Sequence, residues 1–185
     1  MTDEVAFNAL ASGEPIERVF RFCPRCGEAH DGIGKIPFRC KSCGMSHFFG
    51  PVAAVGALIT DEEGRLLLVR RARDPGKGMW GLPGGFVDRE ETIEQSLARE
   101  VMEETGLVLT ERKLLLTGPN EYNYEGVIAP VIDLFFLCKV ESKQALKLEK
   151  DELDHHVWAI PDSEHLNGMA FSSNRLAIEH WLQSS

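Results

Sequence analysis

The longest apolar segments of the chain lie after residue 50 and predict most of its regular structure. Residues 52–60 are apolar and rich in β-branched side chains, which predicts a strand. A polar turn at 61–64 leads to a second strand at 65–71, so the two segments predict a hairpin. By the same reasoning we expect further strands near 86–87, 113–117, 131–140 and 156–160.

Two helices are expected among these strands. One covers residues 91–105, with Asp88 as the candidate N-cap and Gly106 where a left-handed residue would end it. The other is amphipathic and begins at Ser172 or Ser173. Strands mixed with two helices predict an α/β or α+β sandwich.

The composition divides the chain into three regions. Residues 1–20 read as a loose leader, with a candidate helical turn at 5–10. Residues 21–50 are dense in Cys, Gly and basic residues, and 51–185 form the main domain. The net charge of −9 repels nucleic acid outside a local basic patch. Neither a secretory signal nor an apolar run of membrane-spanning length is visible, so we expect a cytoplasmic protein without membrane contact.

Three glutamates share the first predicted helix. Glu100, Glu103 and Glu104 lie at i, i+3 and i+4, where each like-charge pair costs about 0.2–0.5 kcal/mol when exposed. On a helical wheel, Glu100 and Glu104 lie about 20° to either side of Ile93, on the apolar side of the helix. A hard divalent cation such as Mg²⁺ or Mn²⁺ would offset their repulsion. The alternative from these glutamates alone is a solvated acidic helix.

The surrounding pattern is Gly85-x5-Glu91-x7-Arg99-Glu100-Val101-x-Glu103-Glu104-x-Gly106-Leu107. It resembles the Nudix box of the Nudix hydrolase family, and the resemblance extends over residues 51–185. It implies a loop–helix–loop on an α/β/α sandwich with a mixed sheet, and hydrolysis of nucleoside diphosphates linked to another group. It also implies that Arg99 and Glu91 hold the helix and loop, and that the metal ligands are the Gly85 carbonyl, Glu100, Glu103 and Glu104.

The resemblance leaves the catalytic base open. Some members of the family use a glutamate of the box, and others use one from a later loop. Glu152, six residues before Trp158, resembles the acid-then-tryptophan stretch of related members, and Glu149 is the second candidate. Both glutamates also fit a solvated turn.

Cationic and aromatic residues around the box are candidates for substrate binding. Arginine side chains hold phosphates, and aromatic faces stack on nucleobases. The alternative for each of these residues is a structural one: an arginine exposed on the surface, or an aromatic ring packed in the core. The candidates are Arg70, Arg71, Arg73, Trp80, Phe86, Tyr122 and Tyr124.

Short segments point to the substrate class. Residues 170–173, Ala-Phe-Ser-Ser, resemble plant-type FAD and ADP-ribose pyrophosphatases, whereas 117–130 lack the Ser-Gln-Pro stretch of NADH pyrophosphatases. We therefore expect ADP-ribose or FAD as substrate. The alternatives are NADH or NAD-capped RNA, diadenosine polyphosphates through a resemblance at Tyr124, and, in a different class, a nucleotide-sensing regulator that binds nucleic acid.

Four of the five cysteines form two Cys-x2-Cys pairs separated by 13 residues. Four thiolates at this spacing predict a structural zinc site, a zinc ribbon, over residues 21–50. A disulfide pair, an iron–sulfur centre or a histidine ligand, His30 or His47, are the alternatives. The ribbon is locally basic, yet we expect a structural or homodimer-contact role. The paired cysteines are Cys23, Cys26, Cys40 and Cys43, and Cys138 reads as a buried inert thiol.

Overall fold

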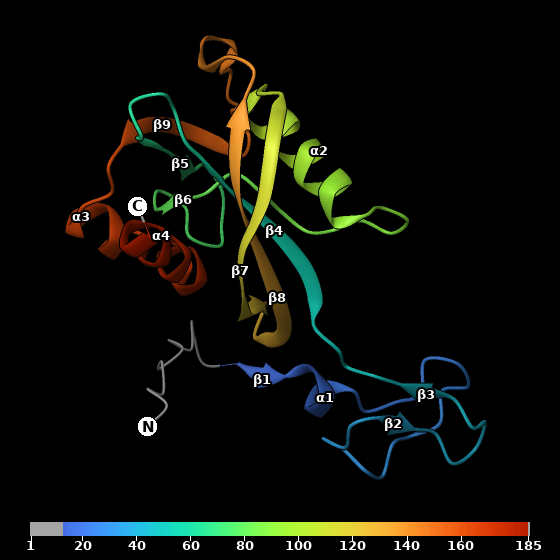
Figure 1. The fold of residues 1–185 in the computed structure, drawn as a ribbon. Helices are drawn as coiled ribbons and strands as arrows, with labels where there is room; N and C mark the ends of the chain where they lie inside the picture. The colour runs from blue at the N-terminus through green and yellow to red at the C-terminus, as the bar shows by residue number, and fades with distance from the viewer. Residues whose placement is uncertain (1–12, 185) are drawn as a thin grey trace. The chain divides into compact units, whose positions relative to one another are not determined.

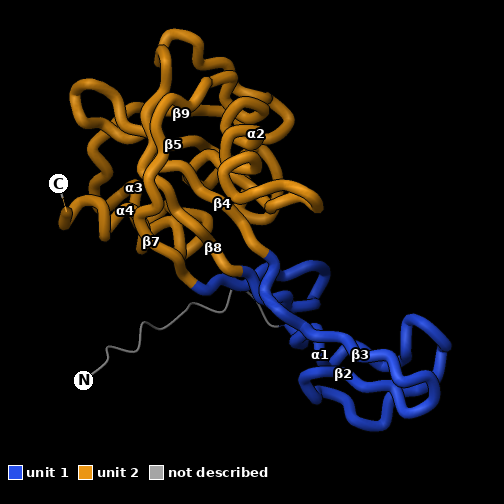
Figure 2. Tube along the Cα trace, turned by 45° about the vertical axis from the view of Figure 1, so that its right-hand side comes forward, with its two compact units in different colours: residues 1–52, 119–131 blue, residues 53–118, 132–185 orange. Residues whose placement is uncertain are grey.

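The computed structural model describes residues 13–184, which form two compact units (Figure 1). The first unit takes in the described residues up to Val52 together with Pro119–Val131, and the second takes in Ala53–Gly118 and the residues from Ile132 onward (Figure 2). The first twelve residues of the predicted leader, with its candidate turn at 5–10, lie outside the described residues.

The first unit is built from short elements around a small core. β1 (Glu14–Pro15) leads into α1 (Ile16–Val19), and β2 (Phe38–Arg39) pairs antiparallel with β3 (Ser46–His47). Ile16 and Phe20 pack against a core of Cys23, Phe38, Cys40 and Phe49. Within the predicted leader, residues 14–19 thus form β1 and α1, and Ile16 and Phe20 contact this core.

The second unit contains two sheets. One is four-stranded: β8 pairs with β4 and β7, and its first residues pair in parallel with β1. In the other, β5 lies between β6 and β9. Both sheets are bracketed by helices (Figure 1). The elements are β4 (Val52–Ile59), β5 (Leu66–Arg71), β6 (Trp80–Gly81), α2 (Ile93–Thr105), β7 (Leu109–Tyr124), β8 (Val127–Val140), the 3₁₀ turn η1 (Lys143–Ala145), β9 (Leu153–Ala159), α3 (Ser163–Asn167) and α4 (Ser172–Ser184). The end of β7 and the start of β8, within Pro119–Val131, belong to the first unit.

Alternate residues of the strands face opposite layers. On β5, Leu67 and Val69 join the core cluster beneath α2, whereas Leu66 and Leu68 join the cluster that contains Ile178 of α4. This period of two is the normal consequence of strand geometry. The expected α/β sandwich is thereby confirmed, with α2 on one side of the strands and α4 on the other.

The predicted hairpin between residues 52–60 and 65–71 is wrong beyond its turn. Thr60 and Leu66 form one antiparallel bridge, and then β4 pairs with β8 while β5 pairs with β9. The turn is held by Asp61, whose buried carboxylate accepts hydrogen bonds from Arg65 and Lys143. Burial opposes ionisation of Asp61, but these bonds outweigh it and hold its pKa well below the usual range.

The start of α2 also differs from the prediction. Its N-cap is Thr92, not Asp88: the Thr92 hydroxyl accepts a hydrogen bond from the Gln95 N–H, and the Gln95 side chain accepts one from the Thr92 N–H. This is a capping box, which satisfies two donors at once. The helix ends at Gly106 with φ 68°, as expected. Among residues 13–184, no helix is both long and apolar enough to cross a membrane.

Candidate active site

Two consecutive glycines bring the loop before α2 against the carboxylates of that helix. Gly84 has φ 147°, and a Cβ there would lie 2.0 Å from the Val55 carbonyl oxygen. Its N–H donates to Oε2 of Glu104 at 2.8 Å. A Cβ on Gly85 would lie 2.7 Å from the Glu100 carboxylate oxygens. Gly84 therefore needs to be glycine, whereas a Cβ on Gly85 would displace the Glu100 carboxylate from its present position.

Glu104 is the most deeply placed carboxylate of the helix, with 6% of the residue exposed. Burial raises its pKa to about 8; the Gly84 N–H lowers it, and the negative charges of Glu100 and Glu152 raise it further. Burial likewise raises the pKa of Glu100, although Arg99 opposes this shift. The wheel placed both residues correctly on the apolar side, where their charges are poorly compensated.

Arg99 connects the helix to the loop through several hydrogen bonds. Its guanidinium contacts Glu91 at 2.7 and 2.9 Å, Glu100 at 2.8 Å and Glu103 at 3.0 Å, and donates to the Phe86 carbonyl at 3.3 Å. The Glu91 carboxylate is the main reason why the Arg99 pKa is raised. Glu103 differs from its two neighbours, because 60% of its side chain is exposed.

The turn at residues 149–152 lies against the end of α2. The Glu149 N–H donates to the Glu104 carbonyl at 2.9 Å, and the Ala72 N–H after β5 donates to the Glu152 carbonyl at 2.7 Å. The charge of Glu152 acts on both Glu100 and Glu104. The structure thus brings Glu152 into the acidic cluster, which we define as Glu100, Glu104 and Glu152.

The three predicted phosphate-binding arginines all have protein partners. Arg70 pairs with Asp154 at 2.6 Å, and Arg73 pairs with Glu152 at 2.6 Å. Arg71 donates to the Pro75 carbonyl at 2.6 Å and lies 5.2 Å from the ring centre of Phe171. The positive charge of Arg71 also lowers the pKa of Glu104, a member of the acidic cluster.

The candidate aromatic residues are distributed over both units. Phe86 belongs to the loop before α2, where it bridges to Ala54 of β4. Trp80 packs near His155 and His165, with ring centres 5.9 and 5.7 Å away. Tyr122 and Tyr124 belong to the first unit and stack on each other at 5.8 Å. The roles of Phe86, Tyr122 and Tyr124 in substrate binding stay predictions from the sequence.

The donor chemistry of the acidic cluster suits a hard divalent cation. The buried Glu104 and the half-buried Glu100, both with raised pKa values, lie beside glycine backbone, and the charge of Glu152 acts on both. Carboxylate and carbonyl oxygens are the ligands that Mg²⁺ and Mn²⁺ prefer. The Gly85 carbonyl accepts the Val55 N–H at 2.8 Å. A carbonyl oxygen has two lone pairs, so this bond leaves one that can coordinate a cation.

The four paired cysteines of the first unit also converge. Their sulfur atoms lie within 4.8 Å of one another, and the Cys23–Cys43 and Cys26–Cys40 separations are each 3.6 Å. Sulfur atoms about 2.3 Å from a tetrahedral zinc ion lie about 3.8 Å apart. A disulfide needs about 2.05 Å, so the cysteines are unbonded thiols whose arrangement fits zinc.

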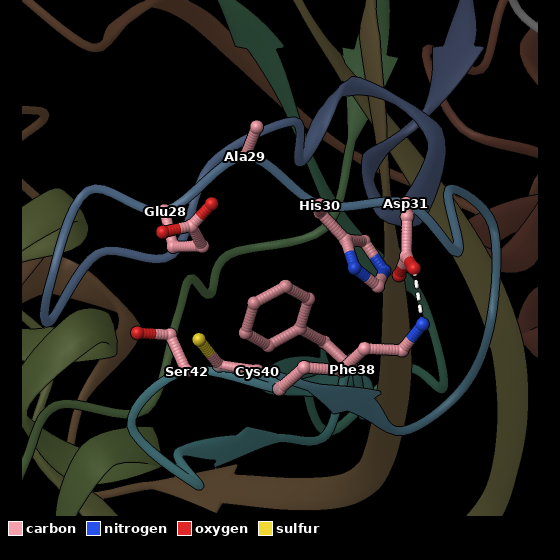
Figure 3. Close-up of a pocket in the computed structure, with 8 residues that line it drawn as sticks. Glu28, Ala29, His30, Asp31, Phe38, Cys40 and Ser42 are labelled. Carbon is pink, nitrogen blue, oxygen red and sulfur yellow. Dashed lines mark hydrogen bonds and ion pairs between the residues drawn. The ribbon is translucent and has the colours of Figure 1, made fainter.

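The two histidines near the cysteines pack against aromatic rings. His30 meets Phe38 edge-on at 4.4 Å, beside a cavity of about 380 Å³ that Asp31 and Lys41 also line (Figure 3). His47 stacks on Phe20 at 5.4 Å. Neither histidine belongs to the sulfur cluster, which favours a ligand set of four cysteines.

Two contributors were missed in the sequence. The Gly84 N–H, rather than a side chain, holds Glu104, and no sequence signal identifies such a bond. Thr92 could have been found, because Thr-x-x-Gln is the pattern of a capping box. Cys138, expected to be buried and inert, is 1% exposed, and burial raises its pKa to about 12.

Comparison with known proteins places this geometry in a family. The family model described as NUDIX domain matches residues 50–177. The chain is 41% identical over 68 residues to an ADP-ribose pyrophosphatase of Methanocaldococcus jannaschii, covering 37% of this chain and 40% of the relative. It is 32% identical over 162 residues to the NAD-capped RNA hydrolase NudC of Vibrio cholerae, covering 84% of this chain and 56% of the relative.

A solved structure gives the same result. The Nudix domain of Shewanella oneidensis NrtR, crystallised with ADP-ribose, is 26% identical and superposes with a TM-score of 0.59, covering 73% of this chain and 88% of that one. The chain spans between two fifths and three fifths of the length of the two curated relatives above. Because the family model covers more than half of its residues, this chain belongs to the Nudix family.

Proposed function

We propose that the chain hydrolyses the diphosphate bond of a nucleoside-diphosphate-linked compound, with ADP-ribose or FAD as the preferred substrate. Membership of the family and the name of the Methanocaldococcus relative support the reaction and the first substrate. The observation that carries the proposal is the acidic cluster, because Glu104 is buried and its pKa is raised to about 8.

In this proposal a Mg²⁺ or Mn²⁺ ion is held by Glu100, Glu104 and the Gly85 carbonyl, with Glu103 in a supporting role. A bound divalent cation neutralises phosphate charge and lowers the pKa of a water molecule. The protein's own contribution is to hold the carboxylates in place. The Gly84 N–H fixes Glu104, and Arg99 fixes Glu100 and Glu103 to the loop residue Glu91.

We assign the role of catalytic base to Glu152. Its charge acts on Glu100 and Glu104, and its carbonyl accepts the Ala72 N–H directly after β5. Glu103 suits the role less well, because 60% of its side chain is exposed, against 32% for Glu152. Arg71 is the candidate contact for a substrate phosphate, since its positive charge reaches the cluster.

A second candidate substrate is NAD-capped RNA. The match to the Vibrio cholerae NudC covers 84% of this chain, whereas the Nudix match stops at residues 50 and 177. The similarity to NudC therefore includes residues outside the Nudix match. Residues 117–130 lack the Ser-Gln-Pro stretch of NADH pyrophosphatases, which is why this substrate takes second place.

For the first unit, we propose that residues 21–50 form a zinc ribbon joined to a hydrolase domain at 51–185. The 3.6 Å sulfur separations and the small core support a metal in this place. A core of so few buried side chains stabilises the first unit only weakly. A bound metal would therefore supply much of its stability.

The substrate is tested by incubating the full chain with Mg²⁺ or Mn²⁺ and separate samples of ADP-ribose, FAD, NADH, diadenosine polyphosphate and NAD-capped RNA. Chromatography of the products should show two monophosphates, formed with the highest kcat/KM from ADP-ribose or FAD. Faster cleavage of capped RNA than of any free dinucleotide would favour the second candidate. Turnover of none of the five compounds would refute the proposal.

The metal site is tested by Glu104→Gln. The amide keeps the shape of the side chain and an oxygen for the Gly84 N–H, but it removes the negative charge. We expect kcat/KM to fall by at least about 10²-fold, comparable to the loss of one preorganised electrostatic contact. Calorimetry should also show weaker Mn²⁺ binding. Glu94→Gln, on the exposed first turn of α2, is the matched control and should retain activity; equal rates in both variants would contradict the assignment.

The ribbon is tested by metal analysis of the purified chain. Plasma emission spectroscopy should find about one zinc ion per chain, and Cys40→Ala should lose it because three thiolates leave the tetrahedral site incomplete. Cys138→Ala removes a cysteine outside the cluster and should keep the zinc. Zinc-free wild-type protein with intact structure in the first unit would argue against a structural metal.

A further inference from the structure

A β-bulge lies where β9 approaches the acidic cluster. β5 and β9 pair regularly from Leu66↔Ala159 to Arg70↔His155, and the next pair is Arg71↔Leu153. Asp154 is the extra residue, and its side chain is held by Arg70 at 2.6 Å. Bulges change the direction of a strand and often occur beside active sites.

The bulge allows Leu153 to join the core beneath α2. Leu153 and Trp158 belong to the same cluster although they are five residues apart, an odd separation that a regular strand would place on opposite faces. The next residue toward the N-terminus is Glu152. The bulge therefore fixes where β9 begins and, with it, the backbone position of Glu152.

The backbone before the bulge is tied on two sides. The Glu149 N–H donates to the Glu104 carbonyl, and the Glu149 carbonyl accepts the N–H groups of Glu152 and Leu153 at 3.1 and 2.8 Å. The Ala72 N–H holds the Glu152 carbonyl at 2.7 Å. These bonds fix the main chain of Glu152, but they leave the direction of its carboxylate to a side-chain partner.

That partner is Arg73, which directly follows Ala72, the residue whose N–H bonds the Glu152 carbonyl. Its Nη2 lies 2.6 Å from Oε1 of Glu152. The Arg73 side chain is 61% exposed and that of Glu152 is 32% exposed, so an ion pair here contributes little to stability. A planar guanidinium does, however, fix the orientation of a carboxylate.

We infer that Arg73 is a positioning residue, which holds the Glu152 carboxylate beside Glu100 and Glu104 and acts on the reaction only through Glu152. The inference rests on the proposed function, in which Glu152 is the base. It differs from the expectation that Arg73 binds a substrate phosphate. The two roles separate in the kinetics, because a phosphate contact changes KM whereas a positioned base changes kcat.

The test is a double-mutant cycle in the full chain with the best substrate of the panel. Arg73→Gln should lower kcat about 10-fold with little change in KM, as losses of supporting contacts commonly do. Glu152→Gln should lower kcat by about 10²-fold or more. In the Glu152→Gln background, Arg73→Gln should cause no further loss of kcat. Arg73→Lys, made in the wild-type chain, should have a higher kcat than Arg73→Gln.

Arg175→Gln is the matched control. Arg175 also pairs with a glutamate, Glu179, at 2.7 Å, on the surface of α4, and its loss should leave both constants unchanged. Thermal midpoints of the variants should match that of the wild type, since both arginines are exposed.

The outcomes are distinct. A rise in KM on Arg73→Gln that persists in the Glu152→Gln background would show that Arg73 binds substrate and would overturn the inference. Unchanged kcat on Arg73→Gln would also overturn it. If Glu104→Gln abolishes activity but Glu152→Gln does not, the hydrolase proposal stands and the inference falls. If the wild type cleaves no diphosphate of the panel, both fall.

Discussion

The carboxylate of Glu104 lies away from water beside two other carboxylates, and the rest of the second unit depends on how that charge is accommodated. A buried negative charge is costly unless it is paired or protonated. In this chain the Gly84 N–H and the more distant Arg71 compensate it only in part, so the pKa remains raised. Under the proposed function, a divalent cation would compensate the part of this charge that the protein's own groups leave uncompensated.

Several separate elements maintain this arrangement. The glycine loop approaches α2 without side chains, Arg99 ties that helix to Glu91, and the bulge in β9 brings Glu152 to the same place. The two core clusters hold α2 and α4 on opposite faces of the strands, so the helix that carries Glu100 and Glu104 is firmly packed. Precise positions of charged groups are easier to maintain on such elements than on free loops.

Local pattern sufficed for much of this structure. The apolar segments predicted β4, β5, β8, β9 and the middle of β7, whereas the strand expected at 86–87 is one bridge residue, Phe86. The wheel placed Glu100 and Glu104 inward, and Gly106 marked the end of α2. The partners of β4 and β5 could not be predicted, because strand pairing depends on contacts distant in sequence. The same holds for the Gly84 bond to Glu104 and for the bulge at Asp154, which exist only once α2, β5 and β9 have packed together.

The central claim is that these carboxylates gather a divalent cation. Anomalous diffraction from a crystal soaked in Mn²⁺ tests it most directly, because the signal locates the ion independently of any activity. The account predicts an anomalous peak within coordination distance of the carboxylates of Glu100 and Glu104. A crystal with full Mn²⁺ access, no peak beside these residues and both side chains turned toward bulk water would contradict it.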